Sequence, residues 1–186
     1  MVYERPIVGY TVRLRPVEES DAEITYKMRS DPDKTKFVHR STGSVLDQLN
    51  YIQKQRVLPG DYLFIVEDFD GNPIGMKGVY NFNEKERTCE TGRFIGYGSQ
   101  IQNIEALKLS FDFAFEILKV EQIYMAALEE NSIMLSIQKR FGVEYIGREL
   151  VEDIGQYNIC SVLTKEAYAE TKVKVEALIK RFANRK

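Results

Sequence analysis

The segment between residues 104 and 120 constrains the fold of this chain more than any other. Its charged side chains recur at steps of three and four residues, which places them on one narrow stripe of a helix. The stripe consists of Glu105, Lys108, Asp112, Glu116 and Lys119. Nearly all the other positions are apolar. A helix of this kind has to be covered on most of its sides, as it is when it packs against a sheet.

Patterns of apolar residues on either side of this segment predict a chain that mixes strands with helices. Strands are predicted over residues 8–17, 62–67, 74–80, 88–97, 121–130, 143–150 and 157–163. Further helices are predicted over residues 21–29, 44–57 and 132–141 and in the tail. The order of the elements is that of an α/β protein.

Length, charge and residue types exclude several classes of protein. The chain has 186 residues, which suits one domain. Its net charge of −2 argues against a polybasic protein, so no nucleic-acid partner is expected. With one histidine, His39, and two cysteines, a Cys/His zinc site would need a ligand of another type, and no metal is expected. A Ser-His-Asp or Cys-His enzyme would depend on His39 alone.

The sequence favours a cytoplasmic location without a membrane partner. Its first residues lack the apolar stretch of a signal peptide, and no apolar run approaches the roughly 18 residues of a membrane span. Two distant cysteines in such a chain are typical of reduced thiols. A disulfide between Cys89 and Cys160 is the alternative.

The charge is divided unevenly along the chain. Residues 1–164 carry a net charge of −6, whereas residues 165–186 hold seven basic and three acidic side chains and carry +4. We therefore expect one domain over residues 1–164 and a basic helical extension over 165–186. The extension could dock on the acidic body, meet an anionic partner or present a solvated helix face.

The polar residues 98–103 precede the apolar helix and form the first candidate for a binding site. A helix N-terminus offers free N–H groups and the positive end of the helix dipole, which suit a phosphate group. Asn103 is the expected N-cap, and Ser99 is a further hydrogen-bond donor.

Five segments in order resemble the GCN5-related N-acetyltransferase (GNAT) superfamily, especially the branch that acetylates ribosomal-protein N-termini and amino sugars. They are VRLRPVEESDA at 12–22, DYLFIVE at 61–67 with GNPIG at 71–75, ETGRFIG at 90–96, IEAL at 104–107 and ENSIMLSIQKRFGV at 130–143. The resemblance covers residues 10–165. It implies a mixed, mostly antiparallel central sheet with helices on both faces. It also implies that the strands at 90–97 and 122–129 splay apart to form an acetyl-CoA site.

The resemblance assigns residues to this co-substrate. The pantetheine arm would pair with backbone at Phe94, Ile95 and Gly96, and the side chain of Asn131 would reach it. The pyrophosphate would lie on Gly98, Ser99, Gln100, Ile101, Gln102, Asn103 and Ile104. Two features depart from the family. Ile101 and Asn103 stand where glycine or alanine is usual, in a loop about two residues short, and Gln138 stands where a tyrosine usually reprotonates the CoA thiolate. A glutamine cannot do this, and a water molecule, Tyr97, Tyr80 or Tyr124 would have to serve instead.

The chemistry of amide formation suggests further site residues. An ammonium acceptor has to lose a proton before it attacks, and Glu90 matches the position of a general base in some family members. Alternatively, Glu90 is a cross-strand partner of Lys77 or Arg93. Tyr80 and Asn81 would line the acceptor pocket, although Tyr80 suits the core equally well. His39 would contact substrate, or else be an exposed or capping residue.

These observations predict acetyl-CoA-dependent N-acetylation of a primary amine by direct transfer in a ternary complex. We favour an amino sugar, often nucleotide-linked, over a protein N-terminus or a small polyamine-like amine, and this preference rests on analogy. A homodimer is compatible with these expectations. The alternatives are a non-catalytic module that binds acyl-CoA or a metabolite, and an interaction protein that uses the basic tail.

Overall fold

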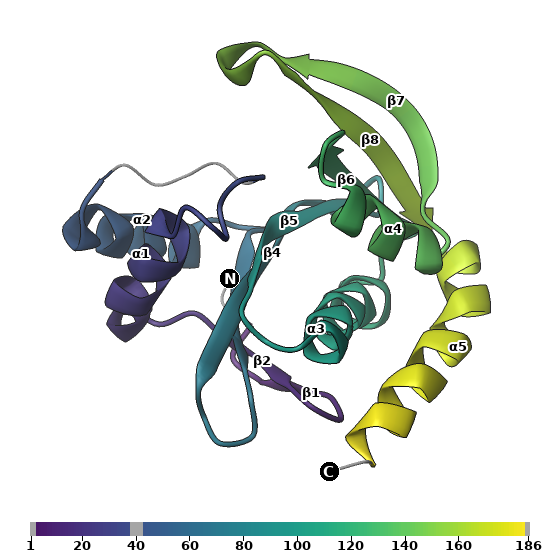
Figure 1. Cartoon of the computed structure of the whole chain (residues 1–186), viewed down its shortest axis with the longest axis horizontal. Helices are drawn as coiled ribbons and strands as arrows, with labels where there is room; N and C mark the ends of the chain where they lie inside the picture. Colours follow the sequence, from purple (N-terminus) through teal and green to yellow (C-terminus); the bar gives the residue numbers. More distant parts are fainter. Residues whose placement is uncertain (1–2, 38–42, 185–186) are drawn as a thin grey trace.

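A single eight-stranded sheet, with the order β1-β2-β3-β4-β5-β6-β8-β7, organises the fold (Figure 1). The computed structural model describes residues 3–37 and 43–184. The strands are β1 (Ile7–Val8), β2 (Arg13–Pro16), β3 (Tyr62–Glu67), β4 (Pro73–Asn83), β5 (Thr88–Gly96), β6 (Gln122–Leu128), β7 (Glu144–Val151) and β8 (Gln156–Thr164). All neighbouring strands are antiparallel except β5 and β6, which run parallel. The predicted mixed, mostly antiparallel sheet is therefore confirmed.

Helices cover both faces of this sheet, as predicted. They are α1 (Ala22–Ser30), α2 (Val45–Val57), α3 (Gln100–Asp112), α4 (Ser132–Arg140) and α5 (Lys165–Ala183). Figure 1 shows α1 and α2 on one side and α3 and α5 on the other. Because side chains alternate across a strand, Ile65 and Met76 join the core beneath α1 and α2, whereas Phe64 and Val79 join the core around α3.

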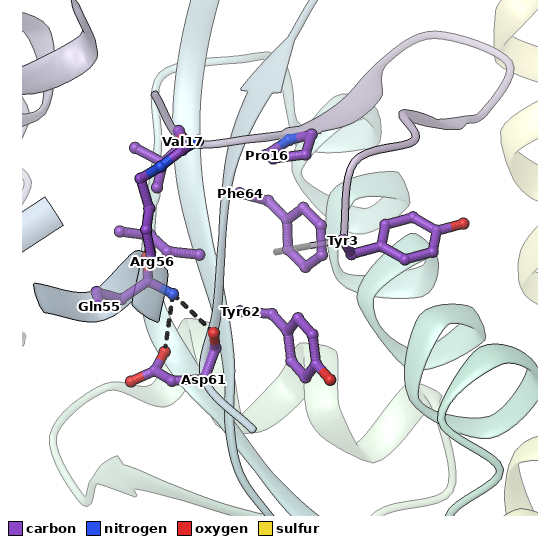
Figure 2. Close-up of a pocket in the computed structure, with 9 residues that line it drawn as sticks. Tyr3, Pro16, Val17, Gln55, Arg56, Asp61, Tyr62 and Phe64 are labelled. Atoms are coloured by element: carbon purple, nitrogen blue, oxygen red, sulfur yellow. Dashed lines mark hydrogen bonds between the residues drawn. The ribbon is translucent and has the colours of Figure 1, made fainter. Parts of the chain in front are cut away.

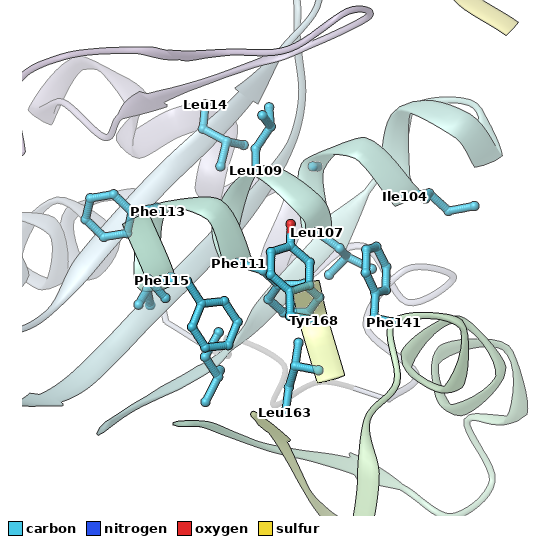
Figure 3. Packing of buried hydrophobic residues seen from close by; sticks show 14 of the residues in the cluster. Leu14, Ile104, Leu107, Leu109, Phe111, Phe113, Phe115, Phe141, Leu163 and Tyr168 are labelled. Carbon is cyan, nitrogen blue, oxygen red and sulfur yellow. The ribbon is translucent and has the colours of Figure 1, made fainter. Parts of the chain in front are cut away.

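The helix predicted over residues 104–120 is covered on most sides, but both of its ends differ from the prediction. Figure 3 shows the phenylalanines of this segment packed among side chains from the sheet, from α5 and from Phe141, which follows α4. After Asp112 the helix widens into a π-helical turn that ends at Ile117. Its start lies at Gln100, four residues before the predicted one.

Asn103 is not the N-cap of α3, and the correction has a local cause. The hydroxyl of Ser99 accepts a hydrogen bond from the N–H of Gln102, whose side-chain oxygen accepts one from the N–H of Ser99 at 2.8 Å. This reciprocal capping box begins the helix at Gln100. Residues 100–103 of the predicted loop therefore form the first turn of α3.

The strand predicted over residues 8–17 is also wrong, because a turn divides it into β1 and β2. The N–H of Gly9 donates to the carbonyl of Val12, and the carboxylate of Glu105 accepts from the N–H groups of Tyr10 and Thr11. Glu105 is only 1% exposed. A buried acceptor on a distant helix therefore supports the turn, which the local alternation of residues does not indicate.

The basic tail docks on the acidic body. Val175 and Ile179 of α5 are buried in the core around α3. Lys172 of α5 pairs with Asp112 at 2.9 Å, and Glu176 of α5 lies 3.8 Å from Lys108. Lys108 and Asp112 of the charged stripe thus find partners on the tail helix.

Two further observations concern the residues that the structure describes. Cys89 and Cys160 are free thiols, so the alternative of a disulfide is wrong. Across residues 3–37 and 43–184, no helix combines the length and apolar character needed to cross a membrane.

Candidate active site

The parallel strands β5 and β6 separate after three paired positions. Their last paired residues are Glu90 and Tyr124. On its other side β5 stays paired with β4, but the register shifts where Lys77 of β4 faces both Arg93 and Phe94 of β5. Arg93 has a positive φ of 53°. This β-bulge bends β5 away from β6 and leaves the sheet open beyond Glu90.

A cleft of about 330 Å³ occupies this opening. It is lined by Phe94, Ile95 and Gly96 of β5 and by Asn131, which caps α4. Its inner wall is apolar, with Leu107 and Phe111 of α3 and Met125 of β6 among the lining residues. The volume lies within the range of small-molecule sites. The structure therefore brings together the four residues predicted to contact the pantetheine arm.

The residues predicted to contact pyrophosphate follow the cleft directly but are arranged differently from a glycine loop. The side-chain amide of Asn103 donates to the carbonyl of Gly98 at 3.1 Å. A Cβ on Gly96 would lie 2.3 Å from the carboxamide oxygen of Asn103, so glycine is required for this close approach. Ile101 packs partly against the core. Both side chains that replace the usual small residues thus have structural roles within α3.

A partly buried ion pair holds the bulge of β5 from the side of α1 and α2. The guanidinium of Arg93 makes two hydrogen bonds to the carboxylate of Asp61, at 2.7 and 2.9 Å, and lies 4.2 Å from the ring centre of Tyr80. Burial acts to lower the pKa of Arg93, but Asp61 raises it overall. Because Arg93 is also the residue with positive φ, this pair fixes the backbone that opens the cleft.

Asp61 is itself held in place by α2. Figure 2 shows the side-chain amide of Gln55 donating to the carbonyl and the carboxylate of Asp61, at 2.8 and 3.3 Å. The crevice between Asp61, Tyr62 and Val17 has a volume of only about 10 Å³. It has room for no more than a water molecule, so it does not compete with the cleft as a substrate site.

The predicted base, Glu90, lies beside the cleft rather than in its lining. Its carboxylate accepts a hydrogen bond from the side-chain amide of Asn81 at 2.8 Å. It pairs with neither Lys77 nor Arg93, so the cross-strand hypothesis is wrong. The role of Glu90 as a base stays a prediction.

Tyr80 pairs in register with Glu90 and lies on the same face of the sheet. A Cβ on Gly92 would lie 2.6 Å from the Tyr80 hydroxyl, so Tyr80 packs directly over this cleft-lining glycine. Burial raises the pKa of Tyr80. His39 lies outside the described residues, and its contact with substrate stays a prediction.

Sequence reasoning missed three charged residues of the cleft, Lys77, Asp33 and Lys34. Lys77 was considered only as a partner for Glu90, yet it lines the cleft and is 3% exposed. Burial lowers the pKa of Lys77 to about 7. The available signal was its position as the single charged residue within 74–80, a segment that is otherwise apolar, glycine or tyrosine. Asp33 and Lys34, from the loop after α1, also line the cleft and gave no comparable signal.

The fold and the split strand pair define an acyltransferase of the GNAT type. The family model for the acetyltransferase (GNAT) domain matches residues 11–144. The chain therefore belongs to the GNAT acetyltransferases and is an N-acetyltransferase that uses acetyl-CoA. Family membership favours the enzyme over the non-catalytic module.

Individual relatives differ in the acceptor that they acetylate. A spermidine N(1)-acetyltransferase from Escherichia coli (strain K12) is 22% identical over 181 residues, which cover 92% of this chain and 96% of that protein. Apo FdhC, a nucleotide-linked sugar GNAT, is 24% identical with a TM-score of 0.79, covering 92% of this chain and 96% of its own. A spermidine N-acetyltransferase from Vibrio cholerae, in complex with CoA and spermine, is 18% identical with a TM-score of 0.78. The match covers 87% of this chain and 99% of that one.

The cleft suits the pantetheine arm of acetyl-CoA. Among the described residues, none pairs with β5 beyond Glu90 on the side of β6, so an extended chain of amides can pair with this edge. The apolar lining from Leu107, Phe111 and Met125 matches the methylene groups of such an arm.

Proposed function

We propose that this enzyme transfers the acetyl group of acetyl-CoA to the amine of a nucleotide-linked amino sugar, by direct transfer in a ternary complex. The charge of the cleft carries this proposal. Of the charged residues described in its lining, three are cationic (Lys34, Lys77 and Arg93) and one is acidic (Asp33). With the charge of Asp61 set against that of Arg93, the lining still carries no net negative charge, so it offers a polycationic polyamine no net attraction.

Aromatic side chains next to the cleft support the same acceptor class. Tyr51 of α2 and Tyr80 of β4 lie against guanidinium groups on the α1–α2 side of the sheet. Arg93 is 4.2 Å from the ring centre of Tyr80, and Arg29 is 5.9 Å from that of Tyr51. Flat rings and guanidinium groups are well suited to bind a nucleobase and phosphate. This face is therefore our candidate for the acceptor side.

The proposal assigns the co-substrate to the opposite end of the cleft. Phe94, Ile95 and Gly96 would pair with the pantetheine amides, and Asn131 would contact the same arm. The turn and helix start at 98–104 would face the pyrophosphate, where the helix dipole favours an anion. Because Ser99 already accepts from the N–H of Gln102, fewer free N–H groups remain than in a glycine loop.

Direct transfer agrees with the state of the buried cysteine. Burial raises the pKa of the Cys89 thiol to about 12, so it stays protonated and is a poor nucleophile near neutral pH. Glu90, oriented by Asn81, would remove the proton of the acceptor ammonium directly or through a water molecule. The neutral amine could then attack without a covalent enzyme intermediate.

A panel of acceptors tests the proposal. Release of the CoA thiol would be measured with a nucleoside-diphosphate-linked amino sugar, the free amino sugar, spermidine and a peptide with a free N-terminus. We expect the highest kcat/KM for the nucleotide-linked sugar. A higher value for spermidine would overturn this acceptor class. Binding of acetyl-CoA without thiol release from any acceptor would instead favour the non-catalytic module.

A further inference from the structure

Lys77 lies on the opposite side of the sheet from the proposed acceptor face. Along β4, Met76 belongs to the core beneath α1 and α2, and Val79 belongs to the core around α3. Alternation therefore directs Lys77 toward α3. Arg93 points the other way, toward Asp61. Lys77 is thus the one charged residue, among those described in the cleft lining, that reaches into its α3 side.

The Lys77 ammonium has no ionic partner. Across residues 3–37 and 43–184, it makes neither a salt bridge nor a hydrogen bond, and it lies 5.8 Å from the ring centre of Phe94. Burying an ammonium group without a partner costs stability, which is the pattern of a group kept for function rather than for the fold. By contrast Lys108, the other deeply buried lysine described, pairs with Asp112 at 2.6 Å.

The charged groups of the surrounding elements are directed elsewhere. Glu105 of α3 accepts from the turn at Tyr10 and Thr11, and Glu90 of β5 accepts from Asn81. The titratable group that faces Lys77 is the thiol of Cys89, which burial keeps protonated. The α3 and α4 residues that share the cleft with Lys77, among them Leu107, Phe111 and Gln138, do not ionise.

The position of Lys77 relates it to the reaction. It stands opposite the bulge of β5, at the point where the sheet opens. Gln138 of α4 is 8% exposed and lines the same cleft, but a glutamine cannot donate a proton to a thiolate. Resting on the proposed function, we propose that Lys77 is a catalytic residue that protonates the sulfur of CoA as it leaves the acetyl group.

The step balances as follows in protons and electron pairs. The acceptor nitrogen forms a bond to the acetyl carbonyl carbon, and the carbon–sulfur bond breaks with its electron pair on sulfur. The Lys77 ammonium gives one proton to that sulfur, and the surplus proton of the acceptor nitrogen passes to Glu90 or water. After the thiol departs, Lys77 regains a proton from solvent. A thiol has a pKa of about 8.5, so an ammonium group with a pKa near 7 is a competent donor.

The test uses CoA alone, so it does not depend on knowing the acceptor. The thiol of CoA bound to the full chain would be titrated by its thiolate ultraviolet absorbance, with desulfo-CoA as the blank. An ammonium group beside the sulfur should lower the pH at which the bound thiol ionises relative to free CoA. Lys77→Met should abolish this shift. Lys34→Met, which removes a cation from the outer part of the same cleft, should leave it in place.

The outcomes separate this proposal from the proposed function. Equal thiol titrations for wild type and Lys77→Met, with CoA bound to both, would overturn the role of Lys77 and leave the acetyltransferase intact. Failure of wild type to bind CoA would overturn both. If Lys77→Met does not fold, Lys77→Arg replaces it. Arginine keeps the charge, so the thiol shift should persist, but it cannot give up a proton, so kcat should fall about 100-fold.

Discussion

Two deeply buried lysines of this protein have opposite surroundings. Lys108, 6% exposed, lies between α3 and α5 and pairs with Asp112 and Glu176. Lys77, 3% exposed, lies in the cleft and has no ionic partner among the described residues. The first arrangement joins two helices. The second holds a charge that does nothing for the fold, which is the pattern expected of a group kept for chemistry.

The same contrast between paired and unpaired charges separates two regions with ion pairs, the α3–α5 interface and the Asp61–Arg93 pair, from Lys77 in the cleft. Asp112 also receives Lys172 and the hydroxyl of Tyr168, so charges between α3 and α5 are matched. Beside the cleft, Asp61 neutralises Arg93. If pairing marks structural charges, removing a paired partner should cost stability, and removing Lys77 should not.

The largest effect on stability is expected for Asp61→Ala. Arg93 would lose its counter-ion while remaining mostly buried, and the bulge would lose its clamp. We expect the free energy of unfolding, measured by urea denaturation, to fall by about 3 kcal/mol. The double variant Asp61→Ala/Arg93→Met should recover part of this loss, because it leaves no unpaired charge. A double variant no more stable than Asp61→Ala would contradict the assignment of a paired, structural charge.

A direct comparison of the two lysines should give the next largest effect. Lys108→Met leaves two carboxylates near a missing cation, and we expect a loss of about 2 kcal/mol in unfolding free energy. Lys77→Met removes an uncompensated charge and should leave stability unchanged or raise it. The two variants replace the same side chain by the same residue, so each is the control for the other. Equal destabilisation by both substitutions would contradict the distinction between Lys108 as a structural charge and Lys77 as a charge that does not stabilise the fold.

The pH dependence of stability should differ in the same way. The pKa of Lys77 is about 7 in the folded protein and about 10.4 when unfolded. Between these values the unfolded chain binds more protons, so this residue makes stability rise with pH, by about 1 kcal/mol per pH unit. Urea denaturation of wild type and Lys77→Met at pH 7, 8 and 9 isolates this contribution. Parallel curves for the two proteins would show that Lys77 does not titrate in this window.

The sequence predicted the fold well because its main signals are local or periodic. The stripe of charges on α3 and the continuous apolar run of β3 follow from the patterns of the elements themselves. The errors occur where distant residues decide the local structure. Glu105 supports the turn between β1 and β2 from 94 and 95 residues away, and no local pattern indicates it.

The candidate site was predicted only in part, for a related reason. The segment 94–96 and Asn131 could be placed because a family resemblance fixed their positions. The role of Lys77 could not be predicted, because it is inferred from the lack of an ionic partner among the described residues. A lone lysine in a strand usually has a partner across the sheet, and only the three-dimensional structure shows that Glu90 is engaged with Asn81 instead.

The smallest expected effect is a rescue that asks whether the α3 side of the cleft needs a proton donor. Lys77→Met should lower kcat about 100-fold with little change in KM. Adding Gln138→Tyr places a hydroxyl in the same cleft, and we expect kcat to recover about tenfold. The alkaline limb of the pH–rate profile should then move toward the pKa of tyrosine, about 10.

Gln138→Phe in the same background is the matched control, since it adds the ring without the hydroxyl. Equal recovery with phenylalanine would mean that the ring volume matters and the proton does not. No recovery with tyrosine, in a double variant that still binds CoA, would mean that Lys77 and Gln138 do not reach the same sulfur atom. Recovery by tyrosine alone would show that the cleft needs an acid on this side, and that the unpaired charge of Lys77 supplies it in this chain.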